Sequence, residues 1–237
     1  NNIDIVFHFA AFVDNAESLR YPKKYFINNF KKGKIFFETC IENKLKKFIY
    51  SSTAAIYANS EKKISEKGLL KPASPYSVSK LKLEKFLNKK KNKLDCVILR
   101  YFNVAGVEKK LRCGFNIRKG KNLILKLCSA SVKKKTFVIN GQNYKTRDGT
   151  TIRDYIHVED LAKIHMSTAN LLMKKKIFQT FNCGYGYGYS VKQILEKFTF
   201  YSKNRIKFKV GERRPKDIVT SIANSNKLKK FIRLQFK

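Results

Sequence analysis

A tyrosine and a lysine four residues apart are the first feature of this chain that could do acid/base chemistry. The stretch "SPYSVSK" (74–80) places Tyr76 and Lys80 just after a proline, where a helix can begin. Residues at i and i+4 share one helix face, so both side chains can reach one reacting atom. A nearby ammonium favours phenolate and lowers a phenol pKa from about 10 towards 7. Chance yields about two such spacings among 12 tyrosines and 42 lysines in 237 residues, so the pair needs support from other segments.

Three short apolar runs alternate with helical patterns in the first hundred residues. The runs at 3–11, 46–53 and 94–102 are typical of parallel strands buried on both faces. Residues 21–44 carry large apolar side chains at helical spacing, and the helix with Tyr76 lies between the second and third runs. This order predicts a βαβαβ unit, half of a doubly wound, Rossmann-like α/β sheet.

The ends of the three predicted strands are polar or small where the strands are apolar. These ends are residues 8–11, 51–53 and 101–103. In doubly wound sheets ligands bind at the carboxyl ends of the strands, so we expect the site there. Further along, the patterns predict a helix at 122–134, a strand at 136–139, a helix at 159–173 and a strand at 178–183.

The formal net charge of +35 raises the possibility of a nucleic-acid partner. Lysines outnumber arginines 42 to 10, lie along every predicted helix and lack interleaved stacking aromatics, which favours a compositional bias over a specific nucleic-acid surface. No run approaches the roughly 18 apolar residues of a membrane span, so we expect no membrane partner and a cytoplasmic location. The five widely spaced cysteines contain no C-x-x-C and indicate reduced thiols rather than disulfides or a zinc site.

Several segments agree in order with one known pattern: "HFAA", "ES", "YPKKYFINN", "SSTAAIYA", "SPYSVSK", "RYFNVAG", "DGTTIRDYIHVEDLA", "NCGYGYGYSV" and "ERRPKD". The chain resembles the extended short-chain dehydrogenase/reductase family, and within it the UDP-glucose (UDP-galactose) 4-epimerases. The resemblance implies an isomerase that epimerises a UDP-hexose at C4 through a 4-keto intermediate, with NAD as cofactor. UDP-galactose and UDP-glucose are the implied substrates, with N-acetylated forms as a further possibility.

The resemblance also assigns roles to residues at the strand ends and on the helix. Tyr76 as phenolate would take the proton of the sugar 4-hydroxyl while hydride passes from C4 to NAD, Lys80 would assist it, and Thr53 would hold the reacting oxygen. Ser51 and Ser52 could instead only close the strand end. The positions implied to face NAD are Phe9, Ala10, Asn28, Ser51, Tyr76, Lys80 and Tyr101.

On the substrate side, the matching positions suit a nucleoside diphosphate. Guanidinium groups bind diphosphate oxygens bidentately, and a carboxylate accepts from ribose hydroxyls. The implied UDP-sugar contacts are Thr53, Asn103, Asn122, Arg153, Arg214, Asp217 and Ser221. Arg153 could alternatively form a salt bridge to Asp154 or Glu159, and His157 is expected to make structural hydrogen bonds.

Ser221 occupies a position where glucose-specific members often carry tyrosine. A small side chain there leaves room beside the C2 substituent of the sugar, which generates the hypothesis that N-acetylhexosamines are accepted.

One family feature is absent from this sequence, namely the first strand with its G-x-x-G-x-x-G turn for the NAD pyrophosphate. The sequence begins with Asn1 at the equivalent of the fourth strand, so the first half of the sheet is expected to be missing and the chain to be a fragment. The predicted regions are a partial NAD-binding domain, 1–103 plus 151–183, and a smaller substrate-binding region, 104–150 plus 184–237.

Four alternatives remain beside the epimerase interpretation. A 4,6-dehydratase is disfavoured because Ala54 and Ala55 follow Thr53 where an Asp-Glu pair would be needed. A UDP-glucuronate or UDP-xylose epimerase or decarboxylase shares the same Tyr, Lys and hydroxyl set. An inactive UDP-binding remnant and a basic nucleic-acid binder come from other classes. The family resemblance further predicts a homodimer formed through helices 26–42 and 76–89.

Overall fold

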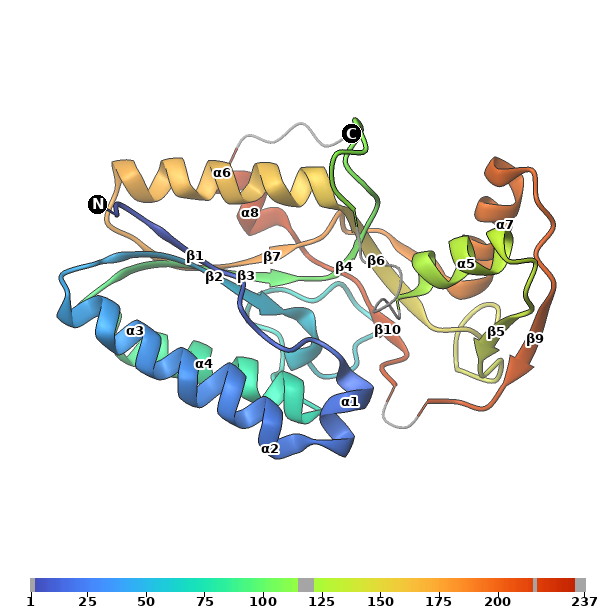
Figure 1. The fold of residues 1–237 in the computed structure, drawn as a ribbon, viewed down its shortest axis with the longest axis horizontal. Coiled ribbons are helices and arrows are strands. Elements are labelled where there is room, and N and C mark those ends of the chain that lie inside the picture. The colour runs from blue at the N-terminus through green and yellow to red at the C-terminus, as the bar shows by residue number, and fades with distance from the viewer. Residues whose placement is uncertain (1–2, 115–121, 215–216, 233–237) are drawn as a thin grey trace.

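Four parallel strands form the main sheet, in the order β1-β2-β3-β7. They are β1 (Val6–His8), β2 (Lys47–Thr53), β3 (Asp95–Tyr101) and β7 (Phe178–Cys183), and all three pairings are parallel (Figure 1). The predicted α/β fold with a parallel sheet is confirmed. Within the described residues, β1 is an edge strand.

The computed structural model describes residues 3–114, 122–214 and 217–232. Asn1, and the proline and lysine at 215–216 of the "ERRPKD" motif, lie outside the described residues.

Helices cover both faces of the main sheet, as a doubly wound fold requires. Figure 1 shows α3 (Gly33–Glu42) and α4 (Pro75–Lys89) on one face and α6 (Val158–Lys174) and α8 (Asn226–Phe231) on the other. Alternate residues of each strand supply the two cores, because successive side chains point to opposite faces. On the α4 side the core contains Phe37, Phe48, Tyr50, Leu83 and Ile98; on the α6 side it contains Ile49, Val97, Leu99, Ile164 and Phe181.

Shorter strands build a second region beside the main sheet. A four-stranded arrangement joins β10 (Thr220–Ser221), β6 (Ile152–His157) and β4 (Asn103–Ala105), with β8 (Gly188–Ser190) antiparallel to β6. A parallel pair, β5 (Phe137–Asn140) with β9 (Phe208–Gly211), packs with α5 (Leu123–Val132) and α7 (Val191–Ser202) around Leu127, Ile139 and Leu195.

The helical segment before β2 differs from the regular helix expected over 21–44. It consists of α2 (Pro22–Tyr25), a π-helical turn, η1 (Phe26–Lys32), and α3, and the short α1 (Asn15–Arg20) precedes it. In the π turn Asn29 faces inward: its amide accepts from Phe12 N and donates to Phe12 O, both at 2.9 Å, and donates to Ser79 Oγ at 3.2 Å. The irregular turn thereby ties the segment after β1 to α4.

Most elements of the main sheet match the sequence prediction, whereas the 12-residue helix α7 and most of the short strands were missed. The strand at 178–183 was predicted with its observed bounds, and the helices at 122–134 and 159–173 within two residues. The missed elements are α1, β4, β6, β8, α7, β9, β10, α8 and the 3₁₀ turn η2 (Ala54–Ile56). Their strands are two to six residues long and are set by pairing with distant segments, which local periodicity does not reveal.

A buried carboxylate fastens the second region to the end of the main sheet. Asp154 on β6 is fully buried and accepts backbone N–H groups from Tyr185 at 2.9 Å, Gly186 at 2.8 Å and Ala223 at 3.1 Å. Gly184 lies so close that an added Cβ would be 2.7 Å from Asp154 Oδ2. Two segments distant in sequence, at 184–186 and at 223, therefore depend on one side chain.

Asp154→Asn is expected to lower the free energy of unfolding by about 2–3 kcal/mol, because the amide NH₂ would face donors that the carboxylate now satisfies. Urea unfolding followed by circular dichroism measures the loss. Asp4→Asn, at an exposed position, is the matched control and should change stability little. Equal stability of the Asp154→Asn protein and the control would contradict this role.

Candidate functional site

Helix α4 begins with a capping box that fixes Tyr76 and Lys80 against the sheet. The Ser74 hydroxyl accepts from Ser77 N at 3.2 Å, and Ser77 Oγ accepts from Ser74 N at 3.1 Å. Pro75 occupies the first turn, where its missing N–H costs nothing. Tyr76 and Lys80 follow on one face and are both buried, with Lys80 only 2% exposed.

The Lys80 amine is held at the carboxyl end of β2. Its Nζ donates to the Ser51 carbonyl oxygen at 2.7 Å and lies 5.0 Å from the centre of the Tyr50 ring. Burial lowers the pKa of Lys80 to about 8, and the charge of Glu84 opposes that shift. Among the described residues, the bond to the Ser51 carbonyl is the one hydrogen bond of the Lys80 Nζ, so two of its N–H donors are left for a ligand.

Tyr76 behaves differently from the expectation that Lys80 would lower its pKa. Burial raises the pKa of the Tyr76 phenol, and a hydrogen bond with Thr53 opposes that shift. Thr53 Oγ1 also accepts from Ala55 N at 3.2 Å, which fixes the hydroxyl at the end of β2. The residues of the chain alone therefore keep the phenol neutral, because desolvation disfavours the phenolate.

A chain of hydrogen bonds joins the ends of β2 and β3 to α6. His165 Nδ1 donates to the Leu161 carbonyl at 2.8 Å, which leaves Nε2 of the neutral ring to accept from the Tyr101 hydroxyl at 2.6 Å. Tyr101 in turn shares a hydrogen bond with Ser51. Phe9 lies 5.0 Å from the His165 ring centre and is 55% exposed, so it offers an open aromatic surface at the end of β1.

Two other residues implied to face NAD lie near this edge. Ala10 is exposed in the segment after β1. Asn28 is half-buried in the π turn, and its Nδ2 donates to Asn29 Oδ1 at 3.1 Å. Together, the structure brings Ser51, Thr53, Tyr76, Lys80 and Tyr101 to the carboxyl ends of β2 and β3.

The second region holds the arginines assigned to the substrate. Arg153 Nη2 donates to Asp217 Oδ1 at 2.7 Å, and Nη1 donates to the carbonyls of Ile152 and Val219. The ion pair of Arg153 is thus made with another implied substrate residue, and the alternative pairing with Asp154 or Glu159 was wrong. Arg214 is exposed and lies 2.9 Å from the side-chain amide of Asn140, whose oxygen faces it.

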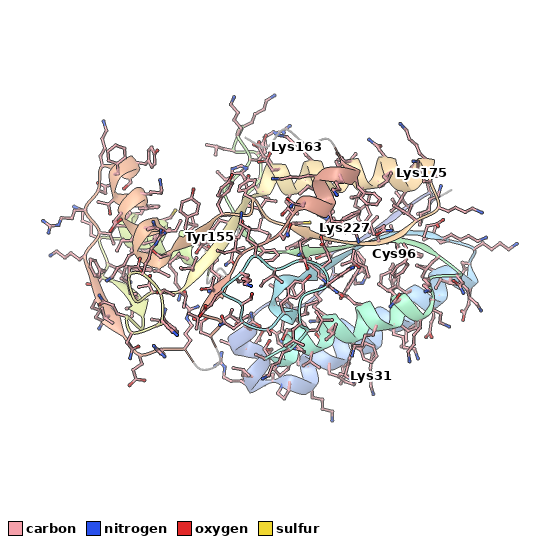
Figure 2. All side chains as sticks on the ribbon, turned by 180° about the vertical axis from the view of Figure 1, so that it is seen from behind. Lys31, Cys96, Tyr155, Lys163, Lys175 and Lys227 are labelled. Carbon is pink, nitrogen blue, oxygen red and sulfur yellow. The ribbon has the colours of Figure 1, made fainter. Side chains whose placement is uncertain are left out.

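Sequence reasoning missed two residues beside these arginines. Tyr155 lies on β6, and burial raises its pKa to about 12, while the charges of Arg153 and Arg214 oppose that shift. Figure 2 shows Tyr155 where the second region meets the main sheet. Asn140 ends β5, directly before Gly141 with its positive φ of 80°. The "IRDYIH" and "ING" stretches carry these residues, but neither signals a contact with Arg214 without the fold.

The remaining implied substrate residues occupy different local settings. Asn103 is exposed at the start of β4, and Asn122 caps α5 by accepting from Leu125 N at 2.9 Å. Ser221 is buried in β10, where it pairs in register with Arg153. His157 caps α6, accepting from Glu159 N at 3.2 Å, so the structural role predicted for it is confirmed.

An open cleft of about 510 Å³ lies beside Arg214 and Asn140. Its walls come from the turns after β5 and β9 and consist of Gly141, Gln142, Asn143, Val210, Gly211, Glu212 and Arg213. Arg213 packs its guanidinium 4.2 Å above the Tyr144 ring centre, and Gly141 leaves room for both, since a Cβ there would lie 2.6 Å from Arg213 Cγ. The cleft is lined by one cationic side chain, Arg213, and one anionic side chain, Glu212, beside the amides of Gln142 and Asn143.

The two halves of the site are tied through the loop that follows β2. Asn59 Oδ1 accepts from the backbone N–H groups of Val219 and Thr220, both at 3.0 Å. Ile64 N donates to Ile222 O at 2.8 Å. The strand that carries Ser221 is therefore anchored to the loop between Thr53 and Tyr76.

Over 3–114, 122–214 and 217–232, no group of three His, Cys, Asp or Glu side chains could hold a metal ion. In the same ranges no helix has the length and apolar character needed to cross a membrane.

Comparisons with known proteins agree with this geometry. Residues 1–184 match the NAD dependent epimerase/dehydratase family. The UDP-glucose 4-epimerase of Halalkalibacterium halodurans is 36% identical over 231 residues, which cover 96% of this chain and 69% of that protein.

Two solved structures show the same fold. The UDP-glucose 4-epimerase of Bifidobacterium longum, in complex with NAD⁺ and UDP, superposes with a TM-score of 0.92 at 32% identity, covering 100% of this chain and 72% of that one. The UDP-Glc/GlcNAc 4-epimerase of Campylobacter jejuni gives a TM-score of 0.79 at 34% identity, with 99% and 72% covered. The chain belongs to the NAD dependent epimerase/dehydratase family.

Proposed function

We propose that this chain performs NAD-dependent epimerisation of a UDP-hexose at C4 and interconverts UDP-galactose and UDP-glucose. The observation that carries the proposal is the buried pair of Tyr76 and Lys80 at the carboxyl end of β2, with the Thr53 hydroxyl hydrogen-bonded to the phenol. The family membership and the UDP-glucose 4-epimerases among its relatives support the same reaction.

The residues at the strand ends fit NAD. The two free N–H donors of Lys80 suit the vicinal hydroxyls of a ribose, and the exposed Phe9 ring with the small Ala10 beside it offers an apolar surface to a flat ring. Ser51 and Tyr101 add hydroxyls, and Asn28 adds an amide. When bound, NAD supplies a reversible acceptor for the hydrogen on C4.

The chain's own residues handle the proton of the sugar 4-hydroxyl. Tyr76 accepts that proton as phenolate and returns it at the end of the reaction, while Thr53 holds the same oxygen by hydrogen bonding. Burial raises the pKa of Tyr76, so the phenolate needs positive charge nearby, which the Lys80 ammonium and a bound cationic cofactor provide. Excluding water from the pair strengthens both interactions.

The second region holds the UDP part under this proposal. Arg214 and Arg153 supply guanidinium groups to the diphosphate, and Asp217 accepts from ribose hydroxyls. Asn103 and Asn122 offer further exposed side chains. The predicted regions assign 1–103 plus 151–183 to NAD and 104–150 plus 184–237 to the UDP-sugar, and Asn103 and Arg153 would reach the UDP part from the first of these.

Tyr76→Phe is expected to reduce kcat for the conversion of UDP-galactose to UDP-glucose at least 100-fold, because it removes the group that exchanges the proton. A coupled assay for UDP-glucose measures the loss. Tyr201→Phe, at a position 77% exposed, is the matched control and should keep wild-type kcat. Retention of more than half of the activity by Tyr76→Phe would refute the assignment of the base.

We also propose that N-acetylhexosamines are substrates, because Ser221 is small and lies on β10 opposite Arg153. Ser221→Tyr should lower kcat/KM for UDP-N-acetylglucosamine at least 10-fold while changing that for UDP-glucose less than twofold, since the phenol ring would occupy the space of the N-acetyl group. An enzyme active on UDP-glucose that does not turn over UDP-N-acetylglucosamine before mutation would disprove this specificity.

Two copies of the chain form a homodimer through α3 and α4 under the same proposal. The support is the exposed apolar surface of α3, where Ile35 is 61% and Phe36 is 40% exposed. Light scattering after size exclusion should give twice the mass of one chain. Ile35→Glu should reduce the measured mass to that of one chain, whereas Leu69→Glu, at another exposed site, should not change it. A single-chain mass for the wild type at micromolar concentration would rule out the dimer.

The proposed partners are otherwise small molecules. The lysine side chains are spread over the molecule, with Lys31 on η1 and Lys163 on α6 on opposite sides of the molecule in Figure 2, which supports an unspecific positive charge rather than a nucleic-acid groove. The free thiols of all five cysteines are in keeping with a cytoplasmic location.

A further inference from the structure

A buried ion pair lies directly behind Lys80 and has no part in the proposed proton transfer. Glu84 follows Lys80 by one helical turn on α4, and Arg100 projects from β3 to meet it. Arg100 Nη2 donates to Glu84 Oε2 at 2.6 Å, and its Nε lies 3.1 Å from Oε1. Both side chains are more than nine-tenths buried.

Neutral groups around the pair hold it in one position. The Ser52 hydroxyl donates to Glu84 Oε1. Arg100 Nη1 lies 2.6 Å from Tyr57 Oη and donates to the Glu66 carbonyl at 3.0 Å, and the Tyr57 hydroxyl donates to Asn182 Oδ1 at 2.7 Å. A fixed network of this kind leaves the carboxylate little freedom to move.

Such a pair contributes little to stability by itself. Desolvating two charges costs several kcal/mol per ion, and replacing a buried pair with apolar residues is often neutral or stabilising. The residues around Lys80 suggest another use for the charge of Glu84.

The groups that face Lys80 come from four elements. On α4 these are Tyr76 and Glu84, and on β1 it is His8, whose burial lowers its pKa to about 4, with the Lys80 charge adding to that shift. His8 is therefore uncharged at pH 7.

The two central strands complete the surroundings. On β2, Tyr50 is fully buried and its pKa lies above its ordinary value, so it is also uncharged. On β3, burial raises the pKa of Tyr101, and the charge of Arg100 is balanced by Glu84. Among the described groups that face Lys80, Glu84 is the one that is anionic at neutral pH.

We propose that Glu84, clamped by Arg100, is a positioning residue that keeps the buried Lys80 amine protonated beside Tyr76. The proposal rests on the proposed epimerase function, in which the ammonium stabilises the Tyr76 phenolate. Glu84 touches neither substrate nor cofactor and acts through Lys80. Arg100 and Ser52 serve by holding the carboxylate in place.

The sign of the effect follows from the charges. Removing an anion near an ammonium favours the neutral amine, so the pKa of Lys80 should fall without Glu84. Lys80 already has a pKa of about 8, so a further fall would leave it partly deprotonated at neutral pH. The fall of kcat/KM on the alkaline side of its pH profile would then begin at a lower pH than in the wild type.

The test measures the pKa of Lys80 by an NMR titration of the full chain, with its lysines labelled with ¹³C at Cε. Lys80 should titrate near pH 8, and Lys80→Arg identifies its resonance. Burial also lowers the pKa of Lys227, and Lys227→Arg distinguishes that resonance from the resonance of Lys80. Glu84→Gln should lower the pKa of Lys80 by about one unit, whereas Glu84→Asp should restore it. Glu66→Gln, which changes a carboxylate at the edge of the same network, is the control and should leave the pKa of Lys80 unchanged.

A second variant guards against a failure to fold, because Glu84→Gln leaves Arg100 buried without its anion. Glu84→Gln combined with Arg100→Gln removes both charges and should still lower the pKa of Lys80. An unchanged Lys80 pKa in the folded single or double variant would overturn the proposal. If wild-type protein does not convert UDP-galactose, the proposed function fails, while the lysine titration still decides whether Glu84 controls Lys80.

The pH profile of kcat/KM provides the catalytic reading. In Glu84→Gln the alkaline limb should move to lower pH by the same amount as the Lys80 pKa, within error. In Glu84→Asp the limb should return to its wild-type pH. A uniform loss of kcat at every pH, without movement of the limb, would mean that Glu84 has only a structural role.

Discussion

The desolvated amine of Lys80 is the interaction on which the site depends. A charged amine with 2% exposure must be compensated locally, and the compensation comes from the Ser51 carbonyl, the face of Tyr50 and the carboxylate of Glu84. These partners lie on two elements that only a parallel sheet with a crossover helix brings together. The capping box at Ser74 then fixes the position of Tyr76 one turn earlier.

The substrate side is assembled by long-range contacts of a different kind. Arg153 and Asp217 are 64 residues apart and pair at 2.7 Å, and Asp154 next to them gathers three backbone donors from distant loops. The same strand, β6, therefore carries both a structural anchor and a candidate ligand contact. Asn59 connects β10 to the loop between Thr53 and Tyr76, so hydrogen bonds link the two halves of the site.

The sequence allowed the long strands, the crossover helix and the Tyr76–Lys80 pair to be predicted, because periodicity and i to i+4 spacing are local properties. The pairing of Arg153 with Asp217, the contact of Asn140 with Arg214 and the clamp of Arg100 on Glu84 join distant segments, and no local pattern encodes them. The π turn escaped prediction for a related reason, since its register is set by Asn29 reaching Phe12 and Ser79. The raised pKa of Tyr76 depends on burial, which spacing does not report.

The central claim is that the hydrogen on C4 leaves and returns within the site while Tyr76 handles only the hydroxyl proton. Turnover of UDP-[4-²H]galactose in ordinary water, followed by mass spectrometry and NMR of the UDP-glucose formed, tests it directly. The account predicts that deuterium is retained at C4 of the product. Replacement of that deuterium by hydrogen from solvent would contradict the account, because it would require C4 to be deprotonated and reprotonated from water.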